Sequence, residues 1–278
     1  MFTWWQALIL GSVQGFTEFL PISSSGHLVL FHSLLGLRDL PLSFDVLTHL
    51  GTLVAVFVFF WPRIKKTDLQ YWGQVGIATI PAVIIGLAGK DAIESTAYNS
   101  WVLGTGFLVS ALFLFICDSL LRQDAVQKRA FPMMNVVDGV VARIRRWQNG
   151  EATERPTWLQ SLLIGSLQAL ALLPSVSRSG SALLGGLVSG LSREEAFNFA
   201  FLISIPVILG ANVIDLIDVW QSGEFAQIPW GVYLLGIVTA GVTGFFSLGL
   251  LKRLMTNSRL DWFAWYLVAV SIVSFLFV

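Results

Sequence analysis

The chain has 278 residues, of which 55% are hydrophobic and only 12% are charged. Soluble domains carry about a quarter of their residues as charged side chains, so this composition excludes a soluble globular protein. The formal net charge is zero, which gives no general affinity for nucleic acid or for acidic partners. The sequence therefore predicts an all-α integral membrane protein surrounded by membrane lipids.

The first predicted element is a helical hairpin over residues 4–36. This apolar stretch is too long for one straight span, and the run Pro21-Ile22-Ser23-Ser24-Ser25-Gly26 interrupts it near its middle. Proline breaks the preceding helix, and Ser and Gly then favour turns. A broken helix at membrane depth is tolerated only where protein or a wet cavity covers it. We therefore expect a re-entrant hairpin that enters and leaves on the same side.

Six further segments are each apolar over about 20 residues, the length that one bilayer crossing requires. Three follow the first hairpin, and three follow a second interrupted stretch at 158–190, which breaks at Pro174–Gly180 and predicts a second re-entrant hairpin. The loop 122–157 links the two sets. Within it, Val136–Trp147 alternates apolar and basic residues and is expected along the inner membrane surface. The predicted spans are 44–61, 72–90, 99–121, 196–218, 230–250 and 260–278.

Lysine and arginine gather in the connections on one side of the predicted bundle. They follow the first full span, fill the loop 122–157 and lie between the last two spans, whereas the other connections carry few. By the positive-inside rule these basic connections are cytoplasmic. Alternation of the spans then places both termini and the first hairpin outside, and the second hairpin on the cytoplasmic side.

The two halves of the chain match each other at an offset of 154 residues. Gly11-Ser12-Val13-Gln14 corresponds to Gly165-Ser166-Leu167-Gln168, and the Ser and Gly positions of the two breaks correspond as well. We therefore predict two inverted-topology repeats, 1–121 and 158–278, joined by the linker 122–157. Repeats of this kind usually place a binding site near the bilayer midplane, between the halves.

Three ionisable residues lie deep in the two predicted hairpins: Glu18, His27 and Arg178. Charged groups at membrane depth are costly and usually mark function. The alternative is a buried structural ion pair between Glu18 and Arg178. Gln14 and Glu18 are four residues apart and project from one helix face. Their oxygens predict a partial shell for Mg²⁺ or Ca²⁺, completed by phosphate and water, whereas the alternative is a pair that only supports helix packing.

The half-helix after the first break begins with Ser23, Ser24, Ser25 and Gly26, followed by His27. The free amides and positive dipole of a helix N-terminus favour an anion. His27 is within reach of Ser24 or Ser23 as an acid or base. The alternative is that the serines cap the helix and allow close packing.

Ser177-Arg178-Ser179-Gly180 opens the second half-helix in the same way and adds a guanidinium. Arginine provides fixed, bidentate donors that match phosphate oxygens. We therefore predict a phosphate-binding site at the midplane, where the two breaks meet. Asp45 and His49, at the outer end of the first full span, are expected behind the contacting residues or simply at the membrane interface.

Three motifs resemble those of a known family. They are Gln14-Gly15-Phe16-Thr17-Glu18, the run from Pro21 to His27, and the run from Pro174 to Gly180. Their order and spacing resemble the bacterial undecaprenyl-diphosphate phosphatases of the bacitracin-resistance type, and the resemblance covers nearly the whole chain. It implies removal of the terminal phosphate of undecaprenyl diphosphate at the outer face of the bacterial cytoplasmic (inner) membrane, which recycles the carrier lipid for cell-wall synthesis. It also implies a divalent cation, Mg²⁺ or Ca²⁺, and six spans with two re-entrant hairpins.

Site roles follow from the same resemblance, position by position. Gln14 and Glu18 are implied as the metal-binding or acid–base pair, Ser24 and His27 as the catalytic pair, and Arg178 as the phosphate clamp. The chain departs from the family pattern at three positions, where Gln14 replaces the commoner Glu, Ser175 a Gly and Ala182 a Thr. The first departure removes one charge and predicts weaker metal binding. Further phosphate contacts are expected from Ser23, Ser25, Ser177, Ser179 and Gly180.

The sequence leaves three matters open. Ser24, His27 and water are each chemically suited to attack the phosphorus. A lipid-phosphate transporter or flippase, with or without hydrolysis, would use the same broken-helix architecture, although it has little use for Ser24 beside His27. A purely structural scaffold leaves the buried Glu, His and Arg unexplained. The oligomeric state is not fixed, and a homodimer is compatible with the sequence.

Overall fold

The computed structural model describes residues 2–34, 42–96, 99–122, 153–226, 228–257 and 259–277. Among these residues, regular secondary structure is helical apart from one isolated bridge between Thr153 and Leu191. The predicted interfacial segment Val136–Trp147, like most of the linker 122–157, lies outside the described residues.

The first predicted hairpin consists of α1 (Trp4–Phe19) and α2 (Ser24–Leu34). A capping box opens α1, in which the Thr3 side chain accepts from the backbone of Gln6 and the Gln6 side chain accepts from the Thr3 backbone. The α1 helix ends two residues before Pro21, as the missing amide of proline requires. The predicted break therefore lies where the sequence placed it.

The second hairpin consists of α7 (Trp158–Ala169), a short 3₁₀ turn η1 (Leu170–Leu172) and α8 (Arg178–Val188). The same capping box opens α7, formed by Thr157 and Gln160. These two residues lie 154 positions after Thr3 and Gln6, and α2 and α8 also begin 154 positions apart.

Five of the described helices are long and apolar enough to cross a membrane, so the chain is a multi-pass membrane protein. The sixth predicted span, 260–278, corresponds to α11 (Asp261–Phe277), which is apolar but has only 17 residues. A short turn, η2 (Glu224–Ala226), lies between the fourth and fifth long helices. The five long helices are α3 (Leu42–Ile64), α4 (Leu69–Thr96, apolar to Gly89), α5 (Ser100–Arg122), α9 (Arg193–Ser222) and α10 (Trp230–Thr256).

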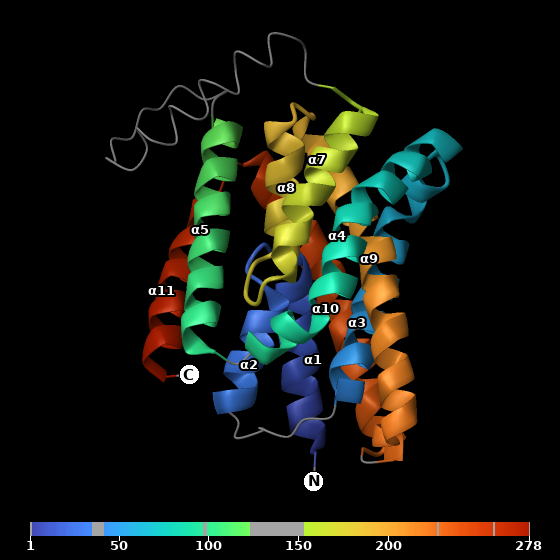
Figure 1. Ribbon diagram of the computed structural model, residues 1–278, viewed down its shortest axis with the longest axis vertical. Coiled ribbons are helices and arrows are strands. Elements are labelled where there is room, and N and C mark those ends of the chain that lie inside the picture. The colour runs from blue at the N-terminus through green and yellow to red at the C-terminus, as the bar shows by residue number, and fades with distance from the viewer. Residues whose placement is uncertain are drawn as a thin grey trace.

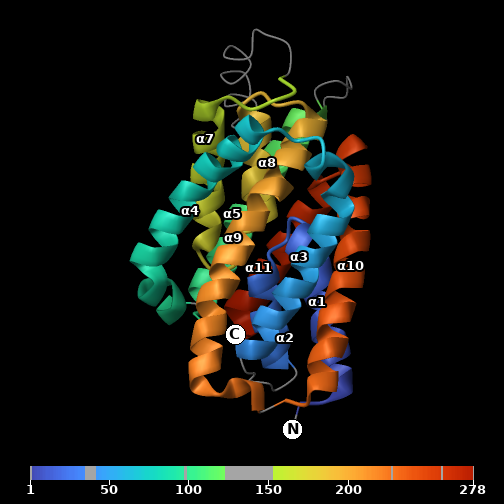
Figure 2. The same ribbon diagram turned by 90° about the vertical axis from the view of Figure 1, so that its right-hand side faces the viewer.

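The two hairpins enter the bundle from opposite ends, and their turns meet near its middle (Figure 1). The α1–α2 hairpin comes from the end where the N-terminus lies, and the α7–α8 hairpin comes from the other end. The α5 and α11 helices cover one flank, and α3, α4, α9 and α10 cover the opposite flank (Figure 2). Close packing depends on glycine, because a Cβ at Gly11 would lie 2.7 Å from the Gly236 carbonyl oxygen on α10.

Exposed tryptophans gather at the two ends of the helices. Such aromatic belts mark the two membrane–water interfaces of membrane proteins. Between the two belts lies an apolar band, whose exposed side chains are mainly Leu, Ile, Val and Phe. The tryptophans at the end that holds the N-terminus are Trp4, Trp5, Trp101, Trp220 and Trp230, and those at the other end are Trp61, Trp158, Trp262 and Trp265.

Ion pairs connect neighbouring helices at the end from which α7 and α8 enter. Arg122 of α5 contacts Asp261 of α11 at 2.8 Å, and Arg63 of α3 contacts Glu195 of α9 at 2.6 Å. In the connection between α3 and α4, the hydrogen bond from Arg155 holds the pKa of Asp68 below its usual range. The first pair stabilises the α5–α11 flank at this end, and the second joins α3 to α9 within the opposite flank.

Candidate active site

Glu18 lies at the centre of a polar cluster in the middle of the bundle. Its Oε2 accepts hydrogen bonds from the Ser24 hydroxyl at 2.6 Å and from the Gln14 amide at 3.0 Å. The Nε2 of His49 on α3 lies 3.6 Å from the same oxygen. The Glu18 side chain is only 4% exposed, so it is held away from bulk water by its neighbours.

Arg178 reaches this carboxylate from the second hairpin. Its Nη1 lies 3.2 Å from Glu18 Oε1, and the pair joins two residues that are 160 positions apart in the chain. Beside it, the Ser179 hydroxyl donates to the Leu20 carbonyl of the first hairpin at 3.3 Å. The two hairpin turns are therefore bonded to each other directly. This arrangement brings Glu18 and Arg178 together as the sequence predicted.

Each turn contains a serine in the left-handed region, Ser23 at φ 71° and Ser175 at φ 62°. This conformation is uncommon for a residue other than glycine and must be stabilised by its surroundings. At the second turn, Ser110 of α5 supplies such support, because its hydroxyl bonds the Ser175 carbonyl and accepts from the Ser177 amide. The second turn is thus held in shape by α5.

The remaining predicted serines line the two turns. Ser177 caps α8 by accepting from the Gly180 amide at 3.1 Å, and its hydroxyl lies 3.2 Å from that of Ser179. The same contact occurs in the first hairpin, where the Ser23 and Ser25 hydroxyls are 3.3 Å apart. Ser25 is exposed, whereas Ser23, Ser177, Ser179 and Gly180 are buried.

The sequence placed His27 within reach of Ser24 or Ser23, and in this structure the ring of His27 bonds neighbours other than the Ser24 hydroxyl. His27 Nδ1 bonds the Ser23 carbonyl at 2.7 Å, and its Nε2 bonds the Tyr266 hydroxyl of α11 at 2.8 Å. Both ring nitrogens are therefore engaged, and Ser24 bonds Glu18 instead. A carbonyl only accepts, so Nδ1 carries a hydrogen, and the Tyr266 hydroxyl donates to Nε2 of the neutral ring.

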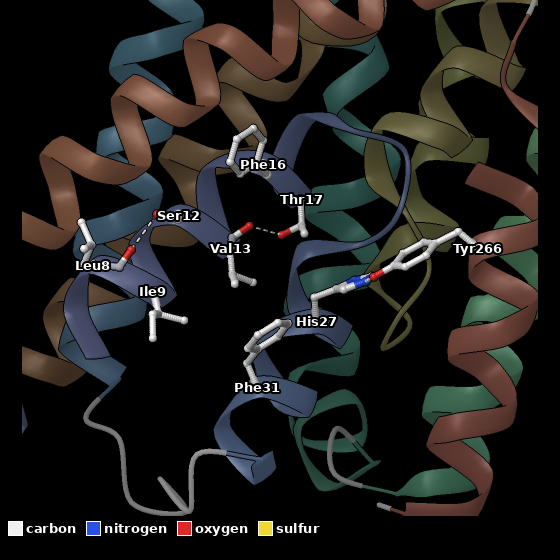
Figure 3. A pocket seen from close by; sticks show the side chains of 9 residues that line it. All are labelled: Leu8, Ile9, Ser12, Val13, Phe16, Thr17, His27, Phe31 and Tyr266. Carbon is white, nitrogen blue, oxygen red and sulfur yellow. Dashed lines mark hydrogen bonds between the residues drawn. The ribbon is translucent and has the colours of Figure 1, made fainter. Parts of the chain in front are cut away.

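His27 and Tyr266 form part of the wall of a cavity of about 420 Å³. The two side chains point toward each other, and the apolar residues of α1 and α2 lie beside them (Figure 3). Several lining residues of α1, including Leu8, Ile9 and Phe16, are exposed on the outside of the helices. The cavity therefore opens sideways, toward the lipid. Its full lining is Leu8, Ile9, Ser12, Val13, Phe16, Thr17, His27, Phe31 and Tyr266.

A second cavity of about 10 Å³ lies directly against Glu18 and Arg178. This volume holds about one water molecule and is too small for a phosphate group. The ion pair of Glu18 and Arg178 therefore closes the polar cluster to a larger ligand in this conformation.

The cluster has donors that fit a hard divalent cation. Gln14 is fully buried, and its Oε1 has no hydrogen-bond partner among the described residues. An unpartnered buried amide oxygen beside a carboxylate is the type of ligand set that Mg²⁺ and Ca²⁺ use. No group of three or more His, Cys, Asp and Glu residues suited to a metal occurs in the described part of the chain. A cation here would need oxygens from its substrate or from water.

Sequence reasoning undervalued two side chains of the site. His49 lies against Glu18, although its place on α3 predicted a position behind the contacting residues. The sequence shows that His49 follows Asp45 by four residues, so both lie on one face of α3. It does not show that this face of α3 is directed toward Glu18. Tyr266 was missed altogether, because a tyrosine in an apolar span usually belongs to the interfacial belts.

Comparison with known proteins identifies the family of the chain. The family model described as bacitracin resistance protein BacA matches residues 7–273. An undecaprenyl-diphosphatase of Carboxydothermus hydrogenoformans is 37% identical over 94% of this chain and 92% of its own length. An undecaprenyl-diphosphatase of Methanosphaera stadtmanae and an undecaprenyl-diphosphatase 3 of Bacillus cereus are 33% and 34% identical, and each alignment covers at least 95% of both chains. The chain belongs to the bacitracin resistance protein BacA family.

Proposed function

We propose that this protein hydrolyses undecaprenyl diphosphate to undecaprenyl phosphate and inorganic phosphate, and so recycles the carrier lipid for cell-wall synthesis. The observation that carries the proposal is the contact of the buried Glu18 carboxylate with both Ser24 and Arg178, where the two hairpins meet. It combines an acceptor for a proton, a hydroxyl nucleophile and a phosphate-binding cation. The printed names of the relatives support the same reaction and the same lipid.

The proposed architecture has six spans and two re-entrant hairpins, arranged as inverted repeats 1–121 and 158–278. The matching capping boxes of α1 and α7 and the hairpin directions support the repeat. Contacts at both ends support α11 as the sixth span. Asp261, at its start, pairs with Arg122, and Phe275, near its end, lies 5.2 Å from Trp101 between ring centroids. The α11 helix therefore runs along the length of α5.

The proposed orientation places the end that holds α7, α8 and the basic connections in the cytoplasm. The α1–α2 hairpin and the open cavity beside it then face the outer half of the cytoplasmic membrane. Undecaprenyl diphosphate with its headgroup outside would reach Glu18 from that side.

Substrate binding must first open the polar cluster, because the small cavity beside Arg178 cannot hold a phosphate. The diphosphate offers more negative charge than Glu18, so we expect Arg178 to leave the carboxylate and bind the phosphate oxygens in bidentate form. The amides at the start of α8, with the Ser177 and Ser179 hydroxyls nearby, add donors for the same anion. This exchange frees Glu18 for proton transfer at the moment when phosphate is bound.

The hydrogen bond from Ser24 to Glu18 gives the nucleophile its base. Ser24 transfers its proton to Glu18 while its oxygen bonds to the terminal phosphorus and the bond to the bridging oxygen breaks. Undecaprenyl phosphate leaves, and water then cleaves the phosphoserine and releases phosphate. Phosphoryl transfer depends mostly on positioning and on stabilising charge, which Arg178 and the helix N-termini provide. His27, held by Tyr266, lies in the wall of the cavity by which the lipid enters and helps to position it.

Gln14 and Glu18 would hold the divalent cation, Mg²⁺ or Ca²⁺. When bound, it would neutralise part of the charge of the diphosphate. The lipid tail would occupy the apolar cavity formed by α1, α2 and α11, whose volume of about 420 Å³ suits the first few isoprene units.

The test is phosphate release from a long-chain polyprenyl diphosphate by the purified protein in detergent, with and without EDTA. We expect release by the wild type, and its loss in Arg178→Ala at an unchanged melting temperature. A correctly folded wild type that releases no phosphate would refute the proposed reaction. Normal hydrolysis by Arg178→Ala would refute the proposed site.

A further inference from the structure

We propose that His49 is a ligand of the divalent cation, through its Nε2, together with Gln14 and Glu18. This inference rests on the cation requirement of the proposed function. It adds an imidazole to a site that would otherwise contain only oxygen ligands. Imidazole favours transition metals over Mg²⁺ and Ca²⁺, so the proposal also concerns which ion the protein prefers.

The orientation of the His49 ring is fixed by its other nitrogen. Nδ1 lies 2.8 Å from the backbone carbonyl of Asp45, one helical turn earlier on α3. A carbonyl oxygen cannot donate, so Nδ1 must carry the hydrogen. In the neutral ring, Nε2 then has a free lone pair. Metal-binding histidines characteristically donate their second ring nitrogen to a backbone carbonyl or carboxylate in this way.

The free nitrogen faces a carboxylate oxygen. His49 Nε2 and Glu18 Oε2 are 3.6 Å apart, too far for a good hydrogen bond and with a lone pair on each side. Two acceptors in this arrangement repel each other unless a cation lies between them. Ligands that each lie about 2.0–2.2 Å from one metal ion are separated by about 3–4 Å, which includes the observed distance.

Gln14 completes the arrangement around the same oxygen. Its amide nitrogen lies 3.0 Å from Glu18 Oε2, and its Oε1 is buried and unpartnered. Rotation of the amide by half a turn would place Oε1 where the nitrogen now lies, beside the Glu18 oxygen that His49 also faces. One carboxylate, one amide oxygen and one imidazole then converge, and the diphosphate and water supply the remaining ligands.

An ordinary ion pair is the competing explanation for this geometry. If His49 carried a second proton, it would attract Glu18 as a cation and would compete with a metal for the carboxylate. The two explanations predict opposite effects of removing the side chain. Loss of a ligand weakens metal binding, whereas loss of a competing positive charge leaves it unchanged or strengthens it.

The experiment uses Mn²⁺ as the probe, bound to the full-length protein in detergent with methylenediphosphonate as a diphosphate that is not hydrolysed. Electron-spin-echo spectroscopy of Mn²⁺ detects a directly bound nitrogen, and titration gives the Mn²⁺ and Ca²⁺ affinities. The variants are His49→Ala and His49→Gln, the second of which retains a polar side chain if alanine disturbs folding. His27→Gln is the matched control, because its ring is bonded to Ser23 and Tyr266 instead.

We expect a nitrogen signal in the wild type and in His27→Gln, and its loss in both His49 variants. Mn²⁺ affinity should fall at least about tenfold in the His49 variants, and Ca²⁺ affinity should fall less. No nitrogen signal in the wild type, or equal or tighter Mn²⁺ binding in His49→Ala, would overturn the inference. If the protein hydrolyses the lipid but gives no nitrogen signal, the His49 inference fails and the proposed function stands. If it gives the signal but does not hydrolyse the lipid, the proposed function fails and His49 remains a metal ligand.

Discussion

The two hairpins share a backbone design but differ in the chemistry that they carry. Both begin with a Thr–Gln capping box, both have a serine with positive φ in the turn, and both place two serine hydroxyls in contact at the start of the second helix. At an offset of 154, however, Glu18 corresponds to Leu172, Ser24 to Arg178 and His27 to Ser181. The first hairpin therefore supplies the acid and the hydroxyl, and the second supplies the guanidinium.

This difference teaches how two hairpins with a similar backbone can together form an asymmetric site. Capping and turn geometry depend on small polar residues that are needed equally in both halves. The charged residues are not needed for that geometry, so each half can carry a different one. Neither hairpin alone has both Glu18 and Arg178, and the site exists only where the two turns are bonded together.

The largest effect should come from the guanidinium of the second hairpin. Arg178→Ala removes the only bidentate phosphate donor from the described cluster, and we expect phosphate release to fall about 10³-fold. Arg178→Lys retains the charge without the planar fork and should recover only part of the activity. Phosphate release at saturating lipid measures this effect. Equal rates for the Lys variant and the wild type would show that charge alone suffices.

A similar loss should follow from the carboxylate of the first hairpin. Glu18→Gln removes the proton acceptor for Ser24 and one oxygen ligand, and we expect at least about a 10²-fold fall in kcat. The variant also leaves Arg178 without its anionic partner, so its affinity for methylenediphosphonate should be retained or increased. Calorimetric titration measures that affinity. A loss of diphosphate binding would mean that Glu18 acts in binding and not in proton transfer.

Two serines, one at the start of the second helix of each hairpin, should separate catalysis from structure. Ser24→Ala removes the hydroxyl bonded to Glu18, and kcat should fall about 10²-fold with little change in thermal stability. Ser177→Ala removes the cap of α8 and should lower stability by about 1 kcal/mol, with a smaller effect on kcat. Thermal unfolding and phosphate release on the same samples compare the two. If Ser177→Ala lost as much activity as Ser24→Ala, the result would contradict the assignment of Ser24 as the nucleophile.

The smallest effect should come from Tyr266 of α11, which bonds His27 of the first hairpin. Tyr266→Phe retains the stacking on His27 but removes the hydroxyl, a hydrogen bond worth about 1 kcal/mol. We expect kcat to fall about three- to tenfold, with KM nearly unchanged. In a His27→Gln background the same substitution should have no further effect, because it acts through that ring. Additive losses would show that Tyr266 contacts the lipid independently.

Much of the fold follows from the sequence, because membrane helices obey strong rules of length, polarity and charge. The prolines and serines at the two breaks located both turns, and the ionisable residues Glu18 and Arg178 located the cluster. The sequence could not decide which neighbour each polar side chain chooses. His27 and Ser24 are three residues apart on one helix, yet His27 bonds Tyr266, which is 239 positions away. Such choices depend on how α3 and α11 pack against the hairpin, and one sequence does not show this.

The sideways opening of the cavity beside His27 has a kinetic consequence. A substrate that enters from the bilayer is dissolved in two dimensions, so its effective concentration is its mole fraction among the lipids and not its molarity in the sample. Adding inert phospholipid at a constant amount of substrate should therefore slow the reaction by surface dilution. Comparisons between detergents or membranes are meaningful only at equal mole fraction.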